Sequence, residues 1–157
     1  VHGTPRSTLD IDLLADIRDE HIAGIVWELG QDFFIDAEGL EESIRRRRSF
    51  NLLHVEGGYK VDVFPAAASA YHRKELDRAV AEPYPGAGED FAVPVATPED
   101  TILSKLVWFR QGGEVSERQW NDVRGVVAVC GSRLDREYLR EWGDALGVRD
   151  LLARVLG

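Results

Sequence analysis

The feature that most constrains the fold is a pair of apolar, β-rich runs, 50–55 and 59–64, separated only by Glu56-Gly57-Gly58. Glycines adopt the positive φ angles that tight hairpin turns require, so the two runs predict an antiparallel hairpin. No other part of the sequence carries so clear a hairpin pattern. It commits this region of the chain to a β-sheet.

A further strand is predicted over residues 8–14, where apolar residues alternate with Asp10 and Asp12 in the period of two that is typical of a strand. Because the run continues as Leu13-Leu14, we expect a central strand of the sheet. Shorter strands are predicted over 33–35 and 91–96, and helices over 18–29, 36–47 and 71–80.

The second half of the sequence is helical in pattern. Thr97-Pro98-Glu99-Asp100 combines a hydroxyl cap, proline at the first helical position and acids in the first turn, and it predicts a helix to about residue 111. Ser116-x-x-Gln119 is a capping box for the next helix. Helices over 136–146 and 150–156 follow. The whole order predicts an α/β (α+β) fold: a mixed β-sheet with flanking helices in residues 1–96, then a C-terminal helical bundle in residues 97–157.

Composition limits the function. The 157 residues include 19 Lys+Arg and 28 Asp+Glu, a net charge of −9 that argues against broad binding to a nucleic-acid backbone. No apolar run approaches the roughly 20 residues of a membrane span, and no signal peptide opens the chain. The single cysteine, Cys130, cannot form an internal disulfide. We therefore expect a cytoplasmic protein that does not enter a membrane.

Three carboxylates stand in the predicted strands. Asp10 and Asp12 are two residues apart, so their side chains share one face, and Asp62 lies in the strand Lys60-Val61-Asp62-Val63-Phe64. If the two strands are neighbours, these oxygen ligands suit Mg²⁺, and a pair of ions would stabilise both oxygens of an in-line phosphoryl displacement. The alternative is that all three carboxylates simply face solvent. Arg6, Ser7 and Thr8 favour the first interpretation, because they place phosphate-directed donors next to the pair.

The run Gly3-x-x-Arg6-Ser7-Thr8-x-Asp10-Ile11-Asp12-Leu13 resembles the first motif of the nucleotidyltransferase-fold superfamily, the polymerase-β-like enzymes. It is most similar to the branch of the abortive-infection AbiEii-type toxins and related uncharacterised bacterial proteins. The strand 60–64 resembles the one that bears the third carboxylate of that family. The stretch from Lys105 through Asn121-Asp122-Val123 is similar to the helical motif that follows the catalytic sheet.

The resemblance implies a site. Asp10, Asp12 and Asp62 would bind Mg²⁺, two ions in all, and Asp62 would activate the acceptor hydroxyl. The same motifs imply that the nucleotide is bound by Arg6, Ser7, Thr8, Lys105 and Asp122. The family also has a Gly-Ser or Gly-Gly turn that anchors the triphosphate, and it would precede Val1. The sequence contains no Met, from which we expect either a trimmed N-terminus or missing methionine positions.

Residue patterns alone do not decide the roles of Lys105 and Asp122. Lys105 lies at the edge of an apolar helical stripe, where an amine can reach either a cleft rim or plain solvent. Asp122 could instead pair with Arg118, four residues earlier. The run Arg45-Arg46-Arg47-Arg48 could attract phosphate, but four cations that end a helix are explained by the helix dipole.

These observations lead to a first functional hypothesis, a Mg²⁺-dependent nucleotidyltransferase that moves a nucleoside monophosphate from a triphosphate to a hydroxyl. The acceptor stays open among RNA (tRNA included), a protein and a small molecule, and the resemblance allows an antitoxin partner. Two alternatives remain: a non-catalytic nucleotide- or partner-binding module, and a metal-dependent phosphohydrolase. The oligomeric state and the preferred base are not predicted.

Overall fold

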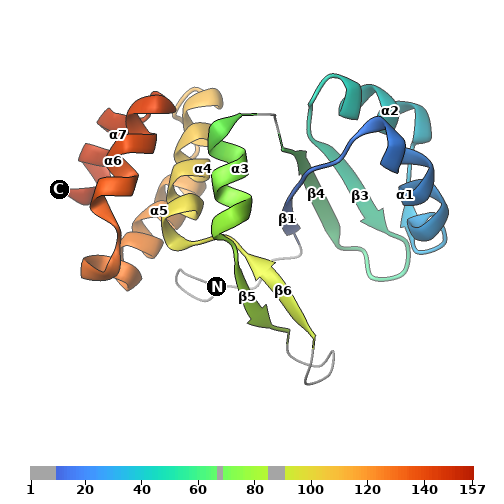
Figure 1. The fold of residues 1–157 in the computed structure, drawn as a ribbon, viewed down its shortest axis with the longest axis horizontal. Helices are drawn as coiled ribbons and strands as arrows, with labels where there is room; N and C mark the ends of the chain where they lie inside the picture. The colour runs from blue at the N-terminus through green and yellow to red at the C-terminus, as the bar shows by residue number, and fades with distance from the viewer. Residues whose placement is uncertain (1–9, 67–68, 85–90) are drawn as a thin grey trace. The chain divides into compact units, whose positions relative to one another are not determined.

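The computed structural model of the chain describes residues 10–66, 69–84 and 91–157 (Figure 1). Its helices and strands run, in order, β1 (Asp10–Ala15), the 3₁₀ turn η1 (Asp19–His21), α1 (Ile22–Leu29), β2 (Phe33–Phe34), α2 (Ala37–Arg45), β3 (Phe50–His54), β4 (Lys60–Pro65), α3 (Ala70–Arg78), β5 (Val80–Pro83), β6 (Ala92–Val95), α4 (Pro98–Gln111), α5 (Glu117–Cys130), η2 (Gly131–Arg133), α6 (Arg136–Ala145) and α7 (Arg149–Leu156). The α/β fold with flanking helices that the sequence predicts is confirmed.

The chain forms two compact units that divide within α3, between Arg73 and Lys74. The sequence pattern placed a boundary later, between residues 96 and 97. The earlier division arises because Arg78, at the end of α3, bonds to the first turn of α4, so that the last part of α3 belongs with the helices. The hairpin of β5 and β6 lies in the same second unit.

The first unit is built on a four-stranded mixed sheet in the order β1-β4-β3-β2. The predicted hairpin is present: β3 and β4 are antiparallel, and Gly58 in the turn has a φ of 62°. Strand β1 runs parallel to β4, and β2 runs antiparallel to β3. Helix α2 packs on β3 and on α1, with Leu40 and Ile44 buried. The helices therefore cover the sheet face that carries the buried residues.

The prediction that the first strand is central is wrong, because β1 forms an edge of the described sheet and pairs there with β4 alone. Its apolar residues Ile11 and Leu13 are 50% and 45% exposed. The alternating carboxylates give the physical reason: charged side chains at an edge discourage pairing with a further strand.

The second unit has a core formed by α4 to α7. Its completely buried apolar side chains include Ile102, Leu103, Leu106, Val123, Leu139 and Leu151. The predicted caps are present: the hydroxyl of Thr97 accepts a hydrogen bond from the Asp100 amide, and the hydroxyl of Ser116 accepts one from the Gln119 amide. Strand β5 was not predicted, because its four residues are exposed and lack alternation.

Within the described ranges, no helix combines the length and the apolar character that a membrane crossing requires.

Truncation of the core residue Leu106 to alanine is expected to lower the free energy of unfolding by about 2–5 kcal/mol, because it leaves a cavity among packed helices. Urea denaturation followed by circular dichroism measures the loss. The matched control is Val129→Ala in α5, since Val129 is half exposed and should change stability by less than about 0.5 kcal/mol. Equal effects of the two substitutions would contradict the placement of the core.

Candidate functional site: a carboxylate row on the mixed sheet

Three polar residues form a row across neighbouring strands of the first unit. Asp12 of β1 is in register with Asp62 of β4, and Asp62 is in register with Asn51 of β3. Residues in register on neighbouring strands project from the same face of a sheet. The strands that carry Asp12 and Asp62 are therefore neighbours, which is the condition that the sequence analysis set for a shared site.

The row faces away from the helices. In β4, Val61 and Val63 alternate with Asp62, and Val63 is almost completely buried. Since successive side chains of a strand point to opposite faces, Asp62 lies on the face opposite to the one that α2 covers. Asp12 is exposed, and the Asp62 side chain is only 19% exposed. The row thus has one accessible carboxylate beside one partly buried carboxylate.

Lys60 is part of this site, although no motif drew attention to it. Its Nζ lies 2.7 Å from Oδ2 of Asp62, and Asp10 is its register partner on β1. The signal was present in the sequence, because Lys60 and Asp62 are two residues apart in a strand and so share one face. The ammonium balances one carboxylate, and it is also a donor that an incoming phosphate could use.

The donor set fits a hard cation. Carboxylate oxygens are the ligands that Mg²⁺ prefers, and Asp12 and Asp62 supply them from adjacent positions. Among the described side chains, no cluster of three or more His, Cys, Asp and Glu residues is arranged to hold a metal ion. The Asp10 side chain lies outside that description, and so do Arg6, Ser7 and Thr8.

Lys105 and Asp122 lie in the second unit and bind each other. The Lys105 Nζ is 3.1 Å from Oδ2 of Asp122, and both side chains are about one fifth exposed. The pair joins α4 to α5, the two helices that form the most extensive packing in this unit. Lys105 therefore has a structural partner in addition to the nucleotide role that the resemblance implies.

A second group of acids, which the sequence analysis missed, is buried in the helical unit. Glu75, Glu99 and Asp100 are each less than a tenth exposed, and Asp100 is completely buried. Oδ1 of Asp100 accepts a 2.6 Å hydrogen bond from the Tyr138 hydroxyl, and Oδ2 accepts one from Thr97. Thr97 belongs to the cap motif of α4, but Tyr138 lies 38 residues further along the chain, so no local pattern could reveal that contact.

Arg78 completes this buried network. Its guanidinium donates to Oδ2 of Asp100 and to Oε2 of Glu99, and it lies 3.9 Å from the centre of the Tyr138 ring. The other oxygen of Glu99 accepts from the Asp135 amide. Every one of these carboxylate oxygens is hydrogen-bonded, which is how buried charge is tolerated in a protein interior. The network joins α3, α4 and α6, and this makes it a structural connection.

Glu75 lies beside that network. Burial raises the pKa of its carboxyl, the hydrogen bond from the Ser104 hydroxyl acts in the opposite direction, and the nearby Asp100 charge adds to the rise, so that the pKa is about 7. Burial also raises the pKa of Tyr138 well above its usual range, and the hydrogen bond to Asp100 adds to this effect. Tyr138 therefore remains a neutral donor at physiological pH.

The raised pKa of Glu75 predicts a dependence of stability on pH. The folded protein keeps the Glu75 proton that the unfolded chain releases above pH 4.5, so stability should fall as pH rises from 4.5 through about 7. Glu75→Gln removes this titration. The free energy of unfolding of the variant minus that of wild type should therefore increase as pH rises from 4.5 to about 7, by up to about 3 kcal/mol.

Urea titrations at several pH values measure the difference. Glu141→Gln is the matched control, because Glu141 is an exposed acid on α6. A constant difference between Glu75→Gln and wild type from pH 4.5 to 7.5 would show that Glu75 ionises normally.

Comparison with known proteins adds no relative: no family model matches the chain, and no curated protein matches it. The resemblance to the nucleotidyltransferase superfamily rests on the residues of its three motifs.

Proposed function

We propose that the chain is a Mg²⁺-dependent nucleotidyltransferase that transfers a nucleoside monophosphate from a nucleoside triphosphate to a hydroxyl acceptor. The observation that carries the proposal is the register of Asp12 with Asp62 on the sheet face opposite to α2, with Lys60 beside them. A solvated strand has no need to place two carboxylates side by side, since like charges in register destabilise a sheet. Lys60 offsets part of that cost at Asp62, and a metal ion held by both carboxylates would offset it further.

In this proposal Asp12 and Asp62 would hold the metal. Asp10, which lies in β1 with Asp12, would be the third ligand. Bound Mg²⁺ would neutralise the triphosphate and polarise its phosphoryl oxygens. Asp62 accepts the proton of the acceptor hydroxyl. The hydroxyl oxygen then bonds to the α-phosphorus, and the bond from that phosphorus to the β-phosphate oxygen breaks. Pyrophosphate leaves with the electron pair of the broken bond.

Lys60 has a specific part in this scheme. Its ammonium neutralises Asp62 in the free protein, where no substrate is present. Because its side chain is 40% exposed, it can turn from the carboxylate to a phosphate oxygen when a triphosphate arrives. This exchange of partners would leave Asp62 available to the acceptor hydroxyl.

The same ion pair also favours a second candidate function. A Lys60–Asp62 pair that persists would occupy the carboxylate, and the chain would then be a nucleotide- or partner-binding module without catalysis. An antitoxin is the partner that the resemblance allows in either case. The proposal includes a cytoplasmic setting, since Cys130 is a buried thiol with no second cysteine in the sequence to pair with and reducing compartments maintain thiols.

The proposal predicts that Asp12→Asn and Asp62→Asn each reduce nucleotide transfer at least about 100-fold, because each removes a metal ligand and Asp62→Asn also removes the proton acceptor. The assay measures transfer of label from α-³²P-NTP to RNA, protein and small-molecule acceptors, with and without EDTA. Asp16→Asn is the matched control. Asp16 is an exposed acid directly after β1, paired with Arg18, and its loss should leave transfer unchanged.

Three outcomes separate the candidates. Metal-dependent transfer that survives both Asp12→Asn and Asp62→Asn would contradict the site. Binding of Mg-NTP in calorimetry with no transfer to any acceptor would favour the binding module. Release of free monophosphate, with water as the acceptor, would identify a phosphohydrolase.

A charge exchange tests whether Lys105 does more than bind Asp122. The double variant Lys105→Asp with Asp122→Lys restores an ion pair between α4 and α5, so its stability should exceed that of either single variant. If Lys105 also binds the triphosphate, NTP transfer should stay at least about tenfold below wild type in the double variant. Full recovery of both transfer and stability would assign Lys105 a structural role alone.

A further inference from the structure

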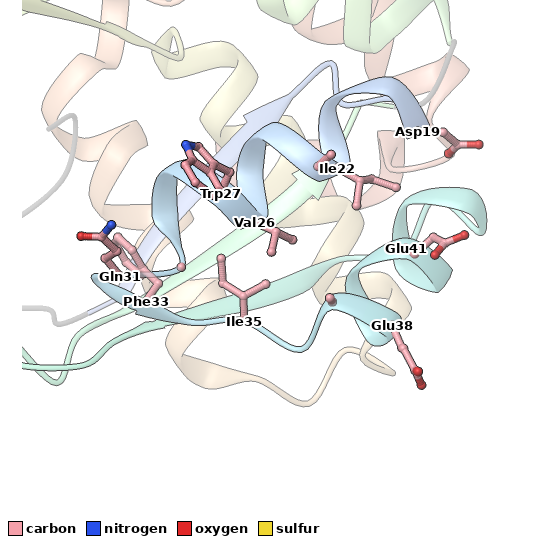
Figure 2. Close-up of a pocket in the computed structure, with 12 residues that line it drawn as sticks. Asp19, Ile22, Val26, Trp27, Gln31, Phe33, Ile35, Glu38 and Glu41 are labelled. Atoms are coloured by element: carbon pink, nitrogen blue, oxygen red, sulfur yellow. The ribbon is translucent and has the colours of Figure 1, made fainter.

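A groove of about 910 Å³ lies in the first unit, between α1 and the segment that runs from β2 into α2 (Figure 2). We refer to it as the α1 groove. Val26 of α1 and Ile35 point toward one another across its middle. Trp27 and Phe33 lie at one end, and acidic side chains lie at the other. None of the predicted nucleotide or metal residues lines it.

Helix α1, beside the groove, is unusually apolar for a helix with no buried residue. The sequence of α1 is IAGIVWEL, yet none of its eight residues is buried. Trp27 is 80% exposed, although a large aromatic side chain is normally well covered. Helices that are apolar on most sides generally have a partner. The exposed surface of α1 therefore indicates an interaction site.

The charged side chains that line the groove are all acidic. Asp19, Glu38 and Glu41 line it, and no lysine or arginine is among its lining residues. Glu41 is paired with Arg45, four residues later in α2. The carboxylates of Asp19 and Glu38 have no hydrogen-bonding or ion-pair partner among the residues that the structure describes. Two carboxylates at one end of an apolar groove are complementary to a cationic group on whatever binds there.

We propose that the α1 groove binds an amphipathic, basic helical segment of a partner protein. An apolar side chain of that segment packs against Trp27 and Val26, and a lysine or arginine pairs with Asp19 and Glu38. Docking of an amphipathic helix in an apolar groove is a common form of peptide recognition. A second copy of this chain fits poorly, because the net charge of −9 makes the copies repel each other.

This site is separate from the proposed catalytic row. The groove belongs to α1, α2 and the segment between them, and α2 covers one face of the sheet, whereas Asp12 and Asp62 project from the other face. The proposal on the α1 groove therefore does not depend on the proposed transferase activity. An interaction here would leave the carboxylate face open.

The test is a selection from a displayed library of random peptides of about 16 residues, long enough to form a helix on binding. The selected peptides are then synthesised with a fluorescent label, and their affinity is measured by anisotropy. We expect them to carry lysine or arginine and apolar residues at helical spacing. Trp27→Ala should weaken their binding at least tenfold, and Asp19→Asn with Glu38→Gln should weaken it and reduce its dependence on salt.

Matched variants keep the test specific. Phe34→Ala removes another exposed aromatic, which lies in β2 outside the groove, and Glu28→Gln removes an acid of α1 that does not line it. Both should leave binding unchanged. Because Trp27 is exposed, Trp27→Ala should not unfold the protein, and circular dichroism checks this.

Four results would overturn the proposal. One is a selection that yields no binding peptide, and another is binding that resists Trp27→Ala. Enrichment of acidic or neutral peptides would contradict the assigned chemistry. A dimer in sedimentation equilibrium that Trp27→Ala dissociates would show that a second copy occupies the groove.

Discussion

The register of β4 with its two neighbours is the constraint on which the first unit depends. It places Asp62 opposite Asp12 on one side and opposite Asn51 on the other. A slip of one residue would turn Asp62 toward the helix-covered face and bring Val63, now buried, out to the polar face. The burial of Val63 beneath the helices therefore fixes the position of the carboxylates. In this way an apolar contact on one face of the sheet determines the geometry of the proposed site on the other.

The acids of this chain have two opposite environments. Asp100 in the helical unit is completely buried, and the Tyr138 hydroxyl, Thr97 and Arg78 satisfy its oxygens. Both oxygens of this buried carboxylate already accept hydrogen bonds from the protein, and these partners explain its position. Asp12 and Asp62 differ, because they share one face and Lys60 is the cation that the structure places beside them. In the proposed function these two carboxylates would hold the metal, and Lys60 would turn to a phosphate oxygen. Burial alone is therefore a poor guide to the site in this protein.

The sequence predicted those features that depend on neighbours in the chain. Thr97 and Ser116 cap the helices that their local motifs indicate, and the glycines after Glu56 connect the expected hairpin. Prediction from the sequence failed for features that depend on residues far away in the chain. The apolar run after Asp12 is typical of a buried strand. Its exposure, however, depends on whether strands pair with it on both sides, and the local alternation of residues does not indicate how many strands pair. The carboxylates could be assigned to neighbouring strands only on the condition that these strands pair, and the pairing itself comes from the structure. The Asp100–Tyr138 contact spans 38 residues and left no local signal.

The α1 groove and the carboxylate row show how one small sheet can have two separate surfaces. Apolar side chains that point to the helix side hold α2 in place through Leu40 and Ile44, but α1 contributes no buried side chain to this layer. A helix that gains so little from intramolecular packing is stabilised only weakly, since most helical stability in proteins comes from burial of an apolar face. A partner on Trp27 would supply that missing burial. Since α1 packs on α2, and α2 on β3, binding in the groove would then also stabilise the helices on this side of the sheet.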